Sequence, residues 1–507
     1  MDVGTTEVKA FIYDESAKVV ATARQSMKLS YPGRDKVEIH PQILWDTFLA
    51  MARKVITDSN VDVHSIKSLG LSTLRNSFSL WNRKTGNHYI NFITWKDNRS
   101  AKVCDQWNNS LTLKVIQSIG SMAYNVTRIR RFMLMSIFKL SPQMVIAKLL
   151  WAFQQDPQIR EDIGKGEVLY GTIDTWLVWK LTGGQVHATD PSNACVSGLY
   201  DPFTMRWSLL STRLFSIPMS ILPEVRDTNG GFGVVGKDVL GLGFELPIGA
   251  VIGDQQAAVF GECCFDVGDV KATLGTGSFI DVNTGNEIHC SFQGTYPLVG
   301  WKLRGQPEAT YLVEGCSSDT GAIIQWAKQV SLFTHMDDLM ADNVATSAGG
   351  VYFVPAFSGL QAPYRDAEAA TAFIGITAET TKQQLMRSIL ESIAFRMKQM
   401  YTIMDGEWDH QMNDLVVDGG VANNDFIVQL TADLTGKQVM RDKHREMSSR
   451  GAAFLAGLSA GIWTNVQQLK KFMDHDVVFH PREAESPAVT RQYSAWEKAV
   501  KRCLQWY

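Results

Sequence analysis

The order of apolar and polar residues predicts that strands and helices alternate along most of the chain. Two side-chain faces alternate over residues 8–13, and a short apolar run covers 19–23, so two strands are expected near the start. Helical apolar spacing over 43–56 and over 382–401 predicts two helices. Further buried strands are predicted at residues 68–73, 246–252, 270–274 and 415–417. This alternation favours an α/β fold.

Glycine-bearing turns begin or follow several of these strands, at residues 2–6, 253–255, 275–278 and 418–424. Because glycine has no Cβ, backbone N–H groups in such turns can approach phosphate oxygens closely. Short hydroxyl donors stand in the same turns, namely Thr5, Thr6, Thr276 and Ser278. A single turn of this kind is more often structural, and no Walker A sequence accompanies them, so a P-loop is excluded.

Two carboxylates, Asp2 and Asp254, stand at predicted strand ends beside these turns. Carboxylates suit a Mg²⁺ ion or a general base at such positions. A structural role is the alternative for Asp254, as the N-cap of a helix that begins at Gln255. From these residues alone the capping role is the stronger interpretation, and the two roles are compatible.

Composition narrows the class of protein. The 507 residues are 45% hydrophobic and 20% charged, which indicates a folded globular protein of roughly two to four domains. A net charge of −3 gives no general attraction to nucleic acid or to an anionic membrane. Seven cysteines without a CxxC pair indicate neither a zinc site nor a redox pair. No signal peptide or membrane-spanning run is visible, so a cytoplasmic location is expected.

A set of short motifs in a fixed order carries a family resemblance. They lie at residues 2–6, 171–177, 253–258, 275–277, 283–285, 325–326, 354–360 with 362–363, 390–394, 418–424 and 451–453. With them the chain resembles the FGGY family of carbohydrate kinases, and within it the glycerol kinase branch. The resemblance implies two actin-like (ribonuclease-H-like) ATPase domains flanking a cleft. Residues 1–248 would form the polyol-binding side and residues 249–507 the nucleotide-binding side.

The resemblance also implies an activity, the ATP-dependent phosphorylation of a small polyol, in the first place glycerol to sn-glycerol 3-phosphate. Asp254 resembles the general base, and Asp2 and Asp254 resemble the carboxylates that support Mg²⁺. The positions that resemble nucleotide contacts are Thr5, Thr6, Lys9, Gly275, Thr276, Gln325, Gly420 and Asn424. The positions that resemble polyol contacts are Arg75, Asn76, Trp95, Gln143, Asp254, Gln255 and Phe279. A homodimer is compatible with the resemblance, which implies no nucleic-acid partner.

Two polyol positions depart from the glycerol kinase pattern. Asn76 stands where glycerol kinases have Glu, and Gln143 stands near their usual Tyr. A lost charge-assisted hydrogen bond to a substrate hydroxyl is worth ~1.5–3 kcal/mol. Retained glycerol kinase activity and a kinase for another polyol or sugar are therefore both open. A nucleotide-binding regulatory protein with weakened catalysis is a third alternative.

Two further stretches depart from the pattern. Residues 118–151 form a longer segment in which Arg128, Arg130 and Arg131 stand beside an apolar run. A surface insertion with one buried helix face is the favoured interpretation, and a contact with a partner or a membrane surface is the alternative. At the start, only Met1 precedes Asp2, so we expect the first turn to be weakly held.

Overall fold

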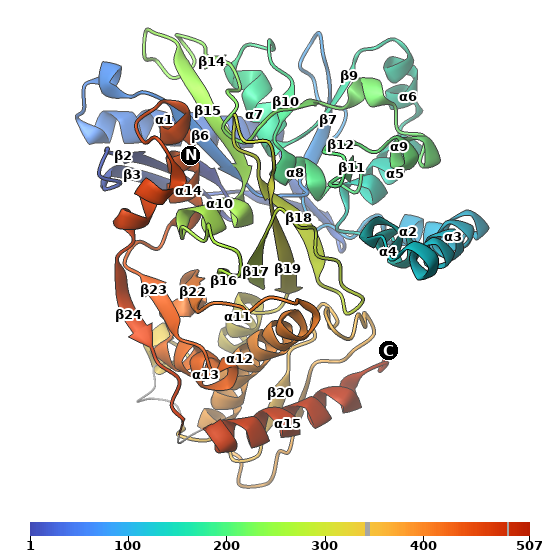
Figure 1. Ribbon diagram of the computed structural model, residues 1–507, viewed down its shortest axis with the longest axis vertical. Helices are drawn as coiled ribbons and strands as arrows, with labels where there is room; N and C mark the ends of the chain where they lie inside the picture. Colours follow the sequence, from blue (N-terminus) through green and yellow to red (C-terminus); the bar gives the residue numbers. More distant parts are fainter. Residues whose placement is uncertain (340–344, 484–485) are drawn as a thin grey trace.

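Two large mixed sheets form the frame of the protein in the computed structural model, which describes residues 1–339, 345–483 and 486–507. Figure 1 shows the amino-terminal half above and most of the carboxy-terminal half below. The first sheet has the order β14 (Val234–Val235), β15 (Leu246–Gly253), β6 (Leu69–Thr73), β1 (Asp2–Val3), β2 (Glu7–Tyr13) and β3 (Val19–Ser26). The second has the order β18 (Tyr296–Trp301), β19 (Thr310–Ser317), β17 (Ser278–Gly285), β16 (Val270–Leu274), β22 (Leu415–Asp418), β23 (Val439–Asp442) and β24 (His475–Phe479).

Smaller sheets and helices complete the two halves. A five-stranded sheet has the order β4 (Leu29–Gly33), β5 (Lys36–Ile39), β8 (Phe92–Ile93), β7 (Phe78–Asn82) and β9 (Val168–Thr172). Short strand pairs are β10 (Ala188–Thr189) with β13 (Glu224–Val225), β11 (Tyr200–Asp201) with β12 (Arg206–Trp207), and β20 (Tyr352–Val354) with β21 (Ala372–Ile374).

The amino-terminal helices are α1 (Pro41–Ser59), α2 (Ala101–Asn108), α3 (Leu111–Thr127), α4 (Arg130–Ile137), α5 (Val145–Gln155), α6 (Pro157–Gly164), α7 (Ile173–Leu181), α8 (Pro191–Cys195) and α9 (Leu209–Leu214). The later ones are α10 (Asp254–Gly261), α11 (Gly321–Gln329), α12 (Lys382–Glu407), α13 (Asp425–Thr435), α14 (Met447–Ser459) and α15 (Ser486–Cys503). Within the described residues no helix is both long and apolar enough to cross a bilayer.

Every strand and helix predicted from the apolar pattern is present. The strands expected at 8–13, 68–73 and 270–274 are β2, β6 and β16, and the helix expected at 382–401 is α12, which continues to Glu407. The other expected elements are β3, α1, β15 and β22. The α/β class is therefore confirmed. Each sheet buries its apolar residues against its own helices, chiefly α1 and α7 on the first and α12, α13 and α15 on the second.

The first turn is firmly held, which corrects the expectation that it is weak. β1 has two residues, yet it pairs antiparallel with β2 and parallel with β6. Val3 is fully buried, and the backbone N–H of Gly4 donates to the Glu7 carbonyl at 2.9 Å. Because strands pair with β1 on both sides, a very short strand suffices to place the turn at residues 4–6.

Helix α14, late in the sequence, returns to the first sheet and packs on α10. Glycines allow the two helices to touch backbone to backbone: a Cβ on Gly451 would lie 1.8 Å from the Ala257 carbonyl oxygen. The expected domain boundary after residue 248 falls inside β15, which pairs with β6 from Ile248 to Gly253. The first sheet therefore includes residues from both sides of that boundary.

Candidate active site

A cavity of about 250 Å³ lies between the two sheets. β1, β6 and β15 run parallel in the first sheet, so their carboxyl ends meet at one edge. The residues that follow these ends line one wall, together with Trp95 and Gln143 from loops. This wall contains the predicted residues Thr5, Thr6, Arg75, Asn76, Trp95, Gln143, Asp254 and Gln255. The opposite wall contains the predicted residues Gly275, Thr276 and Phe279.

Asp254 begins α10 at the end of β15, and its side chain opens onto the cavity with 26% exposure. Protein surrounds the carboxyl on its other sides, and this burial raises its pKa to about 6. The charge of Arg75 opposes the rise, and the charge of Asp2 adds to it. Gly253, not Asp254, is the N-cap of α10, and Asp254 is the first residue of the helix. The expected capping role of Asp254 is therefore wrong by one residue. A carboxylate with this pKa is ionised at neutral pH and can accept a proton.

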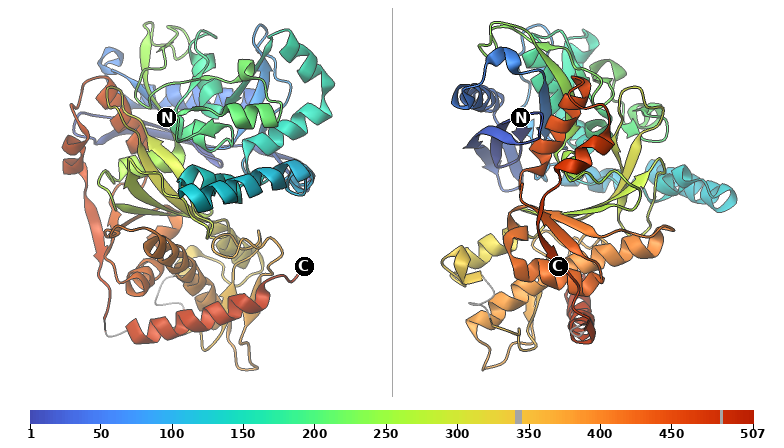
Figure 2. Two further views of the ribbon diagram at one scale, coloured as in Figure 1. Left: turned by 45° about the vertical axis from the view of Figure 1, so that its right-hand side comes forward. Right: turned by 60° about the vertical axis from the view of Figure 1, so that its left-hand side comes forward.

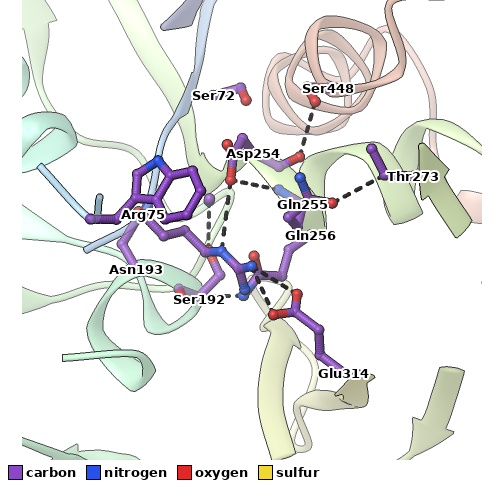
Figure 3. A network of polar contacts seen from close by, with 12 residues as sticks. Ser72, Arg75, Ser192, Asn193, Asp254, Gln255, Gln256, Thr273, Glu314 and Ser448 are labelled. Atoms are coloured by element: carbon purple, nitrogen blue, oxygen red, sulfur yellow. Dashed lines mark hydrogen bonds and ion pairs between the residues drawn. The ribbon is translucent and has the colours of Figure 1, made fainter. Parts of the chain in front are cut away.

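Arg75 is fixed from two sides (Figure 3). Its Nη2 atom donates to both carboxylate oxygens of Glu314, at 3.0 and 2.7 Å, and its Nε atom lies 3.7 Å from Asp254 Oδ1. Glu314 is fully buried on β19 and also accepts a hydrogen bond from the hydroxyl of Tyr296. The Arg75 side chain is therefore held rigidly at the cavity wall, because its charge is neutralised inside the protein.

Asn76 and Trp95 complete the first wall. Asn76 has a positive φ of 57°, and its buried Oδ1 atom has no hydrogen-bond partner among the described residues. An orphaned acceptor at a cavity wall suits a donor supplied by a ligand, such as a hydroxyl group. The indole Nε1 of Trp95 donates to Thr5 Oγ1 at 2.9 Å. This bond joins the turn after β1 to the apolar ring that covers the cavity.

The turn after β16 forms part of the second wall of the cavity. Gly275 and Thr276 follow the last residue of β16, and the N-terminus of α11 packs under them through a Gly321 N–H bond to the Gly275 carbonyl. Gly419 approaches from the end of β22 with a φ of +93°, and a Cβ there would lie 2.4 Å from the Leu274 carbonyl oxygen. Only glycine fits at this approach, and a turn built in this way can serve as a backbone cradle for an anion.

Five predicted residues do not line the cavity. Asp2 is buried behind it, where Ser72 Oγ donates to its Oδ1 at 3.0 Å, and burial raises its pKa. Lys9 Nζ lies 2.5 Å from Glu446 Oε2. Asn424 caps α13 and donates to the Leu339 carbonyl. Gln325 and Gly420 are exposed beyond the second wall.

Asp254 is the carboxylate at the cavity that could ligate a Mg²⁺ ion, and Asp2 lies behind it. Asp2 and Asp254 are close enough that the charge of Asp2 raises the pKa of Asp254. No group of three His, Cys, Asp or Glu side chains suited to a metal occurs in the described part of the chain. Mg²⁺ is commonly held by one or two carboxylates with phosphate oxygens and water, so Asp254 is chemically adequate as a ligand at the cavity, and Asp2 could act through a water molecule.

Several cavity residues were not predicted. They are Thr273, Gly277, Tyr296, Cys316, Ser317, Ser318 and Gln361. Ser317 ends β19 and Ser318 follows it, a polar pair at a strand end that resembles the signals used elsewhere. Tyr296 begins β18 within an ordinary run of residues, and nothing in the local pattern marks it. Glu314, behind the wall, has no local signal either, because its importance comes from Arg75, 239 positions away.

Comparisons with known proteins match most of the chain. The family model described as the FGGY family of carbohydrate kinases, N-terminal domain, matches residues 1–261, and the C-terminal domain model matches 270–460. Glycerol kinase 5 of Danio rerio is 44% identical over 100% of this chain and 96% of its own length. Glycerol kinase 2 of Thermotoga maritima is 34% identical over 100% and 98%.

Solved structures share the fold. The crystal structure of Plasmodium falciparum glycerol kinase with ADP superposes with a TM-score of 0.87 at 29% identity, covering 99% of this chain and 97% of that one. A ligand-bound xylulose kinase from Lactobacillus acidophilus superposes with a TM-score of 0.81 at 20% identity, with the same coverage, and shows the fold alone.

Proposed function

The chain belongs to the FGGY family of carbohydrate kinases, and from this premise we propose that it transfers the terminal phosphoryl group of ATP to glycerol, giving sn-glycerol 3-phosphate and ADP. The observation that carries the proposal is Asp254, a carboxylate of raised pKa that opens onto a cavity between the two sheets. The printed names of the relatives support the choice of glycerol.

Different residues supply the proton acceptor and the substrate contacts that phosphoryl transfer requires. Asp254 accepts the proton of the attacking glycerol hydroxyl. The oxygen of that hydroxyl bonds to the terminal phosphorus, while the bond from this phosphorus to the ADP oxygen breaks. Arg75 and the orphaned Oδ1 of Asn76 hold substrate hydroxyls, and the rings of Trp95 and Phe279 cover the carbon chain.

The phosphates would lie on the other wall. Gly275 and Thr276 line the cavity together with Thr5 and Thr6, whose hydroxyls are available to phosphate oxygens. The Gly275 N–H donates to the Gly277 carbonyl at 2.9 Å, which closes the turn on this wall. Asp2 and Asp254 would hold Mg²⁺, which supplies neutralisation of phosphate charge. Gln325, Gly420 and Asn424 are proposed to contact the remainder of the nucleotide beyond the cavity. All seven cysteines are unpaired, which supports action in the reducing cytoplasm.

Release of ADP in a coupled assay, with glycerol and a panel of larger polyols and sugars, tests the proposal. We expect turnover that requires both ATP and glycerol. Asp254→Asn should lower kcat by about 10²–10⁴-fold and keep nucleotide binding, whereas Asp266→Asn, at an exposed carboxylate, should change neither. Folded protein that binds ATP and yields no polyol-dependent ADP would contradict the proposal and favour the regulatory alternative.

A further inference from the structure

Helix α3 presents a row of apolar side chains to solvent. Leu111, Val115, Ile119, Met122 and Val126 recur every three or four residues, so they lie above one another on one helix face. Their side chains are 53–81% exposed. We call these five residues the α3 stripe. A contiguous exposed apolar face on a helix of 17 residues, about 25 Å long, marks a surface that another body covers.

The α3 stripe is not the face that folds the helix. Leu113 and Gly120, the buried residues of α3, lie on the opposite side. A Cβ on Gly120 would lie 2.8 Å from the backbone nitrogen of Ser136, so α3 and α4 meet closely there. Figure 2 shows this hairpin, in teal, projecting from the body of the protein. The hairpin therefore stands out from the fold, and the stripe residues on it are exposed.

The chain segment that carries the stripe is positively charged. Residues 106–155 contain six basic residues and no acidic ones, although Asp105 directly precedes them and the whole chain carries a net charge of −3. One of the six, Lys148, is fully buried. Arg130 and Arg131 pair with Glu287 and Asp201 and fasten α4 to the body. Lys114, Arg128 and Lys139 are exposed and form no ion pair with any acidic side chain that the structure describes. Lys114 and Arg128 stand at opposite ends of the stripe.

We propose that the α3 stripe docks on the surface of an anionic lipid bilayer, with the helix lying in the plane of the headgroups. The apolar side chains would enter the acyl boundary, and Lys114, Arg128 and Lys139 would contact lipid phosphates and carboxylates. A second copy of the chain fits the charge poorly. An antiparallel pair of α3 helices would bring the Lys114 end of each helix against the Arg128 end of the other, and these like charges repel.

Flotation of the full-length protein with vesicles tests this docking. One set of vesicles is phosphatidylcholine alone, and the other contains about one-third phosphatidylserine, at low and high salt. We expect binding to the anionic vesicles that weakens as salt rises. Met122→Gln with Val126→Gln should reduce the bound fraction at least tenfold, and Lys114→Gln with Arg128→Gln should abolish the preference for phosphatidylserine.

A matched control removes equally exposed apolar residues elsewhere: Leu209→Gln with Leu210→Gln on α9 should leave flotation unchanged. Kinase turnover should be the same in all these variants, because none of the residues lines the cavity. Absent flotation of the wild-type protein, or flotation that survives the α3 stripe substitutions, would overturn the proposal. So would a dimer in sedimentation velocity that the stripe substitutions dissociate, since that would assign the stripe to a second copy.

Discussion

Asp254 sets the pH dependence of the proposed reaction at the scale of single residues. A general base works as the carboxylate, and burial raises the pKa of this group from 3.8 to about 6. We therefore expect kcat/KM for glycerol to be half-maximal near pH 6, level above about pH 7, and to fall about tenfold per pH unit well below pH 6. Initial rates across this range check the prediction, with circular dichroism at each pH to detect acid unfolding. An inflection near the ordinary carboxyl pKa would contradict it.

Glu314 is expected to act as a positioning residue for Arg75. Glu314→Gln removes the charge that holds the guanidinium through two hydrogen bonds, and hydrogen bonds to charged groups are worth ~1.5–3 kcal/mol. We expect the KM for glycerol to rise about tenfold or more and the KM for ATP to change little. Steady-state kinetics measure both.

Two companion variants make the Glu314 prediction secure. Glu308→Gln removes an exposed carboxylate and should leave both KM values unchanged. Tyr296→Phe keeps the Arg75–Glu314 pair and removes one hydrogen bond to Glu314. It should therefore raise the glycerol KM by less than Glu314→Gln does. It also tests the role of Glu314 if the Glu314→Gln protein fails to fold. Equal glycerol KM values in the wild-type protein and in Tyr296→Phe and Glu314→Gln would refute the role.

Site residues at strand ends could be predicted from the sequence, whereas residues that act by positioning another side chain could not. Thr5, Asp254 and Thr276 follow or begin apolar runs, and the structure brings them to one cavity. Tyr296 and Glu314 matter because of a side chain far away in the sequence, which no local pattern encodes. The nucleotide roles of Lys9, Gln325, Gly420 and Asn424 stay predictions, since these residues lie outside the cavity.

At the scale of elements, the crossing of α10 and α14 should be sensitive to one added methyl group. Gly451→Ala would place a Cβ 1.8 Å from the Ala257 carbonyl oxygen. One of the two helices must move to relieve this clash. We expect a loss of about 1–3 kcal/mol in the free energy of unfolding. Because α10 carries Asp254 at its first residue, kcat should fall as well. Denaturant unfolding and turnover measure the two effects.

Gly406→Ala is the matched control for this crossing. Gly406 also lies in a helix, α12, but an added Cβ there meets nothing within 4 Å. This variant should be as stable as the wild-type protein or slightly more stable, because alanine favours helix over glycine. If Gly451→Ala unfolded at the same denaturant concentration as Gly406→Ala, the close contact between α10 and α14 would be disproved.

The α3–α4 hairpin shows why an apolar pattern alone does not settle how a helix is covered. The sequence favoured an insertion with one buried helix face. The structure has that face, at Leu113 and Gly120, and on the opposite side of α3 a second apolar face, the α3 stripe. Apolar spacing identifies residues that avoid water, whether a neighbouring helix or a separate body covers them.

At the scale of the whole molecule, the periodic patterns predicted the α/β class, and the ordered motifs carried the family. The return of α14 to the first sheet could not be read from periodicity, since it depends on the backbone contact at Gly451 between segments nearly two hundred residues apart. The division between domains also stays a prediction, because β15 spans the expected boundary and belongs to the first sheet.

Because the two walls of the cavity belong to different sheets, the binding of ATP and the binding of glycerol should respond to different substitutions. ATP with Mg²⁺ and glycerol should each stabilise the folded protein, by about 2.7 kcal/mol at a hundredfold excess over Kd. Asp254→Asn should keep most of the nucleotide effect, since it leaves the second wall intact and the amide retains an oxygen that can ligate Mg²⁺. Gly419→Ala should reduce the effect of ATP strongly, because a Cβ at this positive φ would push against the Leu274 carbonyl and displace the turn at Gly275.

Thermal unfolding of each variant with either ligand measures these effects. The glycerol effect should survive in Gly419→Ala, because the polyol contacts at Arg75 and Asn76 belong to the first sheet's edge. Loss of both ligand effects together would show that the walls do not act independently. A full ATP effect in Gly419→Ala would contradict the placement of the phosphates on the second wall, and the proposed geometry of transfer from that wall to a hydroxyl beside Asp254 would fall with it.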